Sequence, residues 1–139
     1  MRRPPPPPSI LGASNALALR GGEWFEVTGG SWKPDSAGLS ITKFRVHEQW
    51  LTYFRGHPDQ YKAGWDRYSF QYTGFTTRDG LRRLIQVNAF CVDDVETLYG
   101  EFNYSREWVQ PFRGGSCFFG AVFDPMMKAV TSFEMRETK

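Results

Sequence analysis

Two cysteines and two histidines, Cys91, Cys117, His47 and His57, are the side chains best suited to nucleophilic or metal chemistry. A catalytic thiolate needs a neighbouring base and an electropositive setting, and Cys117 lies between a serine and a phenylalanine. A structural zinc site needs its ligands in close pairs, and the sequence contains no such pair. We therefore predict no catalytic residue, metal site or cofactor. A small hydrolase or metal-dependent enzyme that uses Cys117 and His47 is kept as an alternative.

The two cysteines have a second interpretation as a structural pair. Cys91 lies near the end of one predicted strand and Cys117 near the start of another. If these strands pair antiparallel, the two Cα atoms come within the roughly 4.4–6.8 Å that a disulfide requires. Two buried free thiols are an equally good interpretation. A disulfide would favour an oxidising, exported compartment, and the localisation is otherwise left open.

Two other groups of charged side chains suggest weaker sites. Asp93, Asp94 and Glu96 lack the turn glycine and terminal glutamate of an EF-hand, so we interpret them as a solvated acidic loop. Arginines at 78, 82 and 83 flank the Asp79-Gly80 dipeptide beside aromatic residues, which gives single-stranded nucleic-acid binding through Arg78, Arg82 and Arg83 as a second alternative. With 17 basic and 15 acidic residues, the charge balance argues against a dedicated nucleic-acid protein.

The N-terminal region predicts an extended arm over residues 1–35, rich in Pro and Gly. Five consecutive prolines form a polyproline II rod, which cannot join a helix or a sheet interior. Arg2, Pro5 and Pro8 fit the Arg-x-x-Pro-x-x-Pro ligand of an SH3-type groove. Trp24 and Phe25 are of the types that anchor interfaces, or they fold back over the domain's own sheet. Prolines stand where a signal peptide would have its apolar region, so no signal peptide is predicted here. No apolar run has the length of a membrane helix.

An amphipathic helix is predicted between Gly38 and Gly56, entered through Asp35 and Ser36. At about 100° per residue, one face collects large apolar or aromatic side chains. These are Ile41, Phe44, His47, Trp50, Leu51 and Phe54.

Two β-hairpins are predicted after the helix. In the first, residues 68–73 alternate apolar and polar, and Asp79-Gly80 suits a type I′ turn, so Phe70 lies opposite Ala89 and Gln71 is accessible. In the second, residues 117–123 and 129–135 are joined by 124–128, which places Phe119 opposite Phe133. An extra strand segment is predicted at residues 107–112.

These elements predict an α+β fold, in which one amphipathic helix covers a four-stranded, or with the extra segment five-stranded, antiparallel sheet over residues 36–139. The layout resembles that of cystatins. Several motifs also resemble those of small bacterial proteins without an assigned activity: Trp32, the aromatic strand at 68–72, the arginine hairpin, and the Gly-Gly-x-x-Phe-Phe strand that ends in Asp-Pro. Leu81, inserted between the turn glycine and the arginines, departs from that pattern. The resemblance implies a fold and no activity.

The sequence therefore favours a non-enzymatic module that binds another protein, as an inhibitor, an immunity-type protein or an accessory subunit. The interaction candidates are Arg2, Pro5, Pro8, Trp24 and Phe25. The oligomeric state and the identity of the partner do not follow from these patterns.

Overall fold

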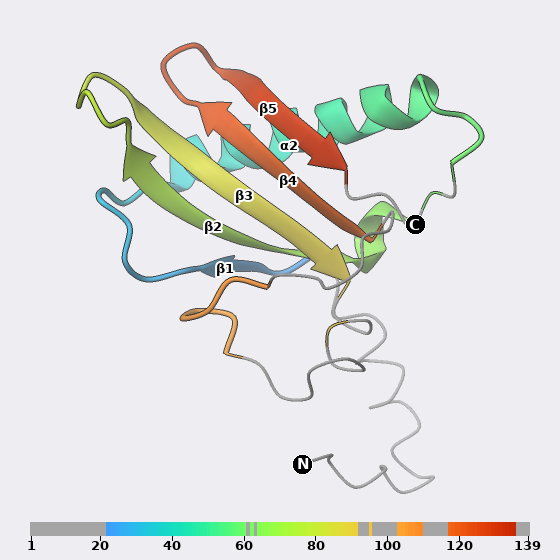
Figure 1. Ribbon diagram of the computed structural model, residues 1–139, viewed down its shortest axis with the longest axis horizontal. Coiled ribbons are helices and arrows are strands. Elements are labelled where there is room, and N and C mark those ends of the chain that lie inside the picture. Colours follow the sequence, from blue (N-terminus) through green and yellow to red (C-terminus); the bar gives the residue numbers. More distant parts are fainter. Residues whose placement is uncertain are drawn as a thin grey trace, which may run out of the picture.

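A computed structural model of the chain describes residues 22–60, 62, 64–91, 95, 103–109 and 117–135 (Figure 1). One helix packs on a five-stranded mixed sheet whose strand order is β1-β2-β3-β4-β5. The elements, in chain order, are β1 (Trp24–Glu26), α2 (Ser36–Arg55), the short 3-10 helix η2 (Trp65–Arg67), β2 (Tyr68–Thr76), β3 (Arg83–Cys91), β4 (Phe118–Asp124) and β5 (Ala129–Met135). The predicted α+β class, with a helix on a sheet, is confirmed.

The fifth strand of the described sheet comes from the predicted arm. β1 pairs parallel with β2, with Trp24 opposite Phe70, and the described residues 107–109 form no strand. The chain passes through α2 between β1 and β2, and such a crossover brings two strands together in parallel. The prediction of an entirely antiparallel sheet is therefore wrong, and the part of the predicted arm from Gly22 onwards lies against the sheet.

Helix α2 begins and ends where the sequence predicts. Its buried face includes Trp50 and Phe54 of the predicted face but is rotated away from the rest of it. Asp35 caps its first turn by accepting a hydrogen bond from the Gly38 N–H at 2.7 Å, and Gly56 follows its last residue. Two members of the predicted apolar face, Phe44 and Leu51, are 59% and 40% exposed. The buried side chains recur every fourth residue and so form a row along one side of the helix. They are Thr42, Val46, Trp50 and Phe54.

The first hairpin has the predicted register and a different turn. Phe70 lies opposite Ala89 and Tyr72 opposite Val87. The Gly80 N–H donates to the Thr77 carbonyl at 2.8 Å. Among the non-glycine residues described, only Lys128 has a positive φ. A type I′ turn needs positive φ at both central residues, so that part of the prediction is wrong. Residues 78–81 form a longer connection that preserves the pairing.

Gly80 has a φ of 75°, and we expect Gly80→Val to lower the free energy of unfolding by about 1–2 kcal/mol, because a Cβ in the left-handed region is strained. Urea denaturation measures the loss. Arg78→Val is the matched control, since Arg78 is exposed in the same turn and its φ is not positive. Equal stabilities of the two variants would contradict the prediction.

The second hairpin is shifted by two residues from its predicted register. Phe119 lies opposite Met135, and Ala121 opposite Phe133, with a β-bulge between Val122 and Phe123. Asp124 holds the turn by accepting hydrogen bonds from the backbone N–H groups of the two following methionines. A shift of two keeps Phe133 and Met135 on their predicted face. Beyond the bulge the offset is one, so that Val130 packs against the core and Thr131 is exposed. The predicted pairing of Phe119 with Phe133 and the predicted core position of Thr131 are therefore wrong.

The two faces of the sheet are covered differently. Tyr68, Phe70 and Phe119 pack beneath α2, where Trp50 contacts Tyr68 with a ring-centroid distance of 6.0 Å. On the opposite face, residues 103–109 pack against the sheet, and Tyr104 stacks on Phe90 with ring centroids 5.1 Å apart. This second layer buries Gln71 completely, so the prediction that Gln71 is accessible is wrong.

Candidate functional site

The arm residues proposed as contacts divide into two groups. Arg2, Pro5 and Pro8 lie outside the described residues. Trp24 stacks on Phe70, with ring centroids 4.2 Å apart, and Phe25 stacks on Tyr104 at 4.9 Å on the other face. Both β1 aromatics are half-buried against their own sheet. This agrees with the interpretation that they fold back over the domain's own sheet.

The two cysteines are joined in a disulfide. The Cα atoms of Cys91 and Cys117 lie 5.3 Å apart, and the Cys91 N–H donates to the Cys117 carbonyl at 3.1 Å. The bond links the end of β3 to the residue before β4. A bonded sulfur is not a nucleophile, so catalysis by Cys117 would require prior reduction.

His47 is placed for packing. Its ring stacks on Trp65, with centroids 4.2 Å apart and planes 10° from parallel. Partial burial among these aromatic rings lowers the pKa of His47 below the ordinary value of 6.5. A half-buried, neutral imidazole that faces aromatic rings contributes mainly contact area.

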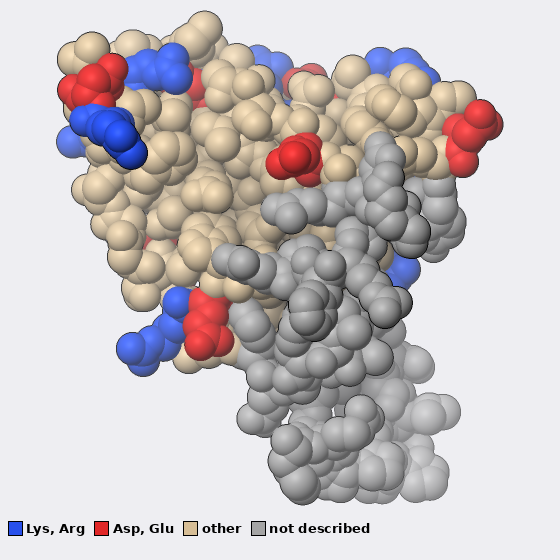
Figure 2. Space-filling model, viewed as in Figure 1, with Lys and Arg blue, Asp and Glu red and all other residues tan. Residues whose placement is uncertain are grey.

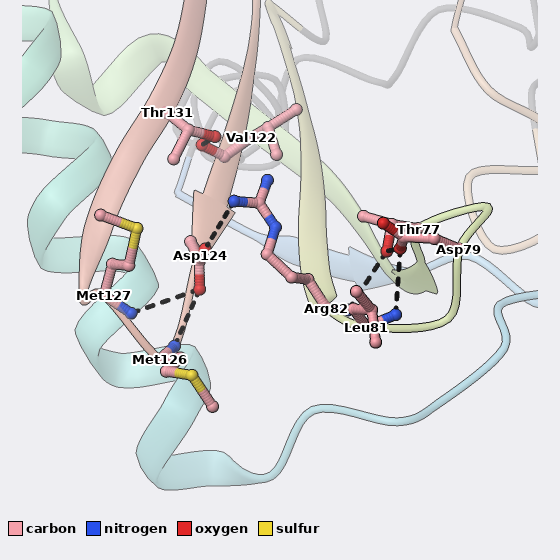
Figure 3. Close-up of polar contacts among 9 residues, drawn as sticks. All are labelled: Thr77, Asp79, Leu81, Arg82, Val122, Asp124, Met126, Met127 and Thr131. Atoms are coloured by element: carbon pink, nitrogen blue, oxygen red, sulfur yellow. Dashed lines mark hydrogen bonds and ion pairs between the residues drawn. The ribbon is translucent and has the colours of Figure 1, made fainter.

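Two of the three arginines of the first hairpin contact other side chains of the chain. Basic side chains gather with acidic ones at the end of the sheet where the hairpin turns lie (Figure 2). Arg82 Nη1 lies 3.7 Å from Asp124 Oδ2 in the neighbouring turn (Figure 3). The guanidinium of Arg83 lies over the Trp32 ring at 5.7 Å. Arg78, Arg82 and Arg83 are all exposed, and single-stranded nucleic-acid binding through them stays an alternative.

The acidic loop residues Asp93, Asp94 and Glu96 lie outside the described residues. Within the described part of the chain, no three His, Cys, Asp or Glu side chains gather closely enough to hold a metal ion.

An open groove beside α2 is a site that the sequence did not indicate. It has a volume of about 430 Å³ and lies between the outer side of α2 and the first residues of β5. A second hollow of about 330 Å³ continues it past the end of the helix, and the two share Leu51 and Arg55. We call both together the α2–β5 groove. Its lining includes Arg45, Glu48, Thr52 and Val130 in the first hollow, and His57, Gln60 and Lys62 in the second.

The α2–β5 groove carries an excess of positive charge. Arg45 Nη1 pairs with Glu48 Oε1 at 2.8 Å, which neutralises the one carboxylate in its lining. Arg55 and Lys62 add two further cations, and the Lys62 ammonium lies 5.2 Å from the Trp50 ring centroid. Leu51 supplies an apolar wall between the two hollows. A ligand that fits this lining combines an apolar group with a carboxylate.

β5 contributes Val130 to the groove lining, and the outer edge of the same strand is free in the described structure. β5 is the last strand of the sheet order, and no described strand pairs with its outer side. Alternate residues of an edge strand direct their N–H and C=O groups away from the sheet. The register shift leaves Thr131 unpaired between Val130 and Ser132, which limits regular pairing on the free edge to residues 132–135.

Sequence patterns indicated little of this site. The alternation in β5 predicts that Val130 faces away from the core, whereas Val130 packs against the core and lines the groove. The groove itself depends on how far α2 overhangs β5, and no local pattern encodes that distance.

Comparison with known proteins adds no assignment: no protein family, curated protein or solved structure matches this chain. The described residues contain no helix that is both long and apolar enough to span a membrane.

Proposed function

We propose that this chain is a non-enzymatic binding module that takes up an extended, acidic segment of another protein beside β5. The observation that carries the proposal is the free edge of β5 next to the α2–β5 groove. An inhibitor, an immunity-type protein and an accessory subunit all act by contact of this kind.

Backbone pairing and the groove supply complementary parts of the recognition. An added strand gains main-chain hydrogen bonds from the sheet edge, and its alternate side chains enter the adjoining groove. Residues 132–135 provide the edge. Leu51, which is 40% exposed on the helix side, provides an apolar contact for one of the inserted side chains.

The positive charge of the groove lining favours a negatively charged ligand. Arg55 lies in the last turn of α2 and lines both hollows of the groove. Its guanidinium can bind a carboxylate in a two-bond geometry. An acidic side chain or a C-terminal carboxylate on the incoming segment therefore gains an interaction that a basic segment lacks.

The placement of the enzyme candidates also supports a contact function. The disulfide occupies Cys117, and Trp65 stacks on His47. Each of the two side chains on which the hydrolase alternative depends thus has a structural partner.

A displayed library of random nine-residue peptides tests the proposal with the full chain as target. We expect enrichment of peptides that carry an acidic residue near an apolar one. Binding of the selected peptides should fall at least tenfold in Arg55→Glu and in Leu51→Glu, and amide exchange of β5 should slow when a peptide binds.

Arg78→Glu is the matched control, because it makes the same charge reversal at an exposed site on the first hairpin. It should leave peptide binding unchanged. Selected peptides that bind the two groove variants as well as the unmodified chain, or that protect amides only outside β5, would contradict the proposal.

A further inference from the structure

Three of the large apolar side chains that the described structure exposes lie on two adjacent turns. Leu81, in the β2–β3 turn, is 79% exposed, and Met126 and Met127, in the β4–β5 turn, are 88% and 63% exposed. Phe44 and Leu51 on α2 are the other exposed large hydrophobics. Single exposed apolar residues are common on proteins, whereas a cluster on neighbouring turns marks an interaction surface.

The β2–β3 turn holds Leu81 out by hydrogen bonds to an aspartate. Asp79 Oδ1 accepts from the Thr77 hydroxyl at 2.5 Å and from the Leu81 N–H at 3.0 Å. These hydrogen bonds lower the pKa of Asp79 below its usual value, so the carboxylate that fixes the turn stays ionised at neutral pH. Leu81 therefore projects from an ordered turn.

The β4–β5 turn is built in the same way and is joined to the first. Asp124 Oδ1 accepts from the Met126 N–H at 3.0 Å and from the Met127 N–H at 3.3 Å. Asp124 itself is buried, and Arg82 from the first hairpin reaches its second oxygen (Figure 3). The two turns thus lie at the same end of the sheet and are linked by this ion pair (Figure 1).

Positive charge flanks the three apolar side chains. Arg78, Arg82, Arg83 and Lys128 lie in or beside the two turns. The carboxylates among them, Asp79 and Asp124, are both committed to the hydrogen bonds of the turns. The two turns thus combine exposed apolar tips with cationic side chains, and we call these seven side chains the hairpin-tip surface.

We propose that the hairpin-tip surface docks on an anionic lipid bilayer, with Leu81, Met126 and Met127 entering the interfacial region. Transfer of apolar side chains from water to the acyl boundary lowers the free energy, and neighbouring Lys and Arg are attracted to anionic headgroups. The unbranched methionine side chain adapts to such a fluid environment. The surface shares no residue with the α2–β5 groove, so this proposal is independent of the proposed function.

Co-sedimentation of the full chain with phospholipid vesicles tests the inference. We expect binding to vesicles of phosphatidylcholine and phosphatidylglycerol in a 3:1 ratio, at least tenfold weaker binding to pure phosphatidylcholine, and loss of binding in high salt because salt screens the charges. The triple variant L81Q/M126Q/M127Q should bind at least tenfold more weakly, with an unchanged melting temperature.

Phe44→Gln is the control, because it removes an exposed apolar side chain from α2 and should leave vesicle binding intact. Should the triple variant not fold, Arg78→Glu combined with Lys128→Glu tests the cationic base and should also reduce binding. Failure of the unmodified chain to bind anionic vesicles, equal binding to both lipid compositions, or retained binding by the variants would overturn the proposal. So would preferential binding of a single-stranded DNA oligonucleotide that competes with the vesicles.

Discussion

Replacing Cys91 and Cys117 together with alanine should lower the free energy of unfolding by about 3–4 kcal/mol, which is the loop-closure entropy that a disulfide of this span removes from the unfolded chain. The two cysteines are separated by 26 positions. The closed loop includes residues 103–109, whose packing covers one face of the sheet. The variant should therefore lose both the covalent closure and some order in that layer. The melting temperature should fall by on the order of 10 °C.

The unmodified chain in excess reductant is the control for the loss of the two sulfur atoms. Its melting temperature should fall to about that of the double variant, since both lack the covalent closure. Thiol titration of the denatured, unreduced protein should find no free thiol. Two titratable thiols, or a melting temperature that reductant leaves unchanged, would contradict the prediction.

The sequence predicts those parts of the fold in which local patterns and turn chemistry agree. Alternation in residues 68–73 and the Asp79-Gly80 dipeptide together set the β2–β3 register, and Phe70 indeed lies opposite Ala89. The predicted turn type is wrong, but the register depends only on which residues lie opposite each other, and this pairing is as predicted. Asp35 and Gly56 likewise mark the two ends of α2 because capping is a local interaction.

Long-range packing explains what the sequence could not predict. A segment as short as that of Trp24 and Phe25 does not show by itself which strand it pairs with, and β1 pairs with β2 once α2 has turned the chain. Phe44 is larger and more apolar than Thr42, yet Thr42 is buried because the sheet contacts that side of the helix. The free edge of β5 and the position of α2 beside it are likewise set by how the layers pack. The candidate groove therefore could not be predicted from the sequence.

Gln71 is the clearest example of a polar residue whose role depends on the second layer. Its side-chain amide donates to the Tyr104 carbonyl at 2.9 Å and to the Glu107 carbonyl at 2.5 Å. Its carbonyl oxygen accepts from the Val109 N–H at 2.8 Å and from the Asn88 amide at 3.0 Å. One buried side chain thus satisfies three backbone groups of residues 103–109.

Gln71→Met should lower the free energy of unfolding by about 2–4 kcal/mol, because it leaves buried backbone groups without partners at about 1–3 kcal/mol each. Gln86→Met is the matched control, since Gln86 is exposed on β3 and surface changes of this kind cost less than about 0.5 kcal/mol. Hydrogen exchange of the Val109 amide should accelerate in the Gln71 variant alone. Equal stability of the two methionine variants would show that the network contributes nothing.

Gln71→Glu separates hydrogen bonding from side-chain volume. An ionised carboxylate can still accept from Val109 and Asn88, but it cannot donate to the two carbonyl oxygens and is repelled by them. Burial beside these oxygens raises the pKa of the glutamate carboxyl in the folded state above its unfolded value of about 4.3. The stability deficit relative to the unmodified chain should therefore be small below that pH, where the protonated carboxyl donates one hydrogen bond, and should grow as the pH rises. A deficit that does not change between pH 4 and pH 8 would mean that Gln71 acts through its shape alone.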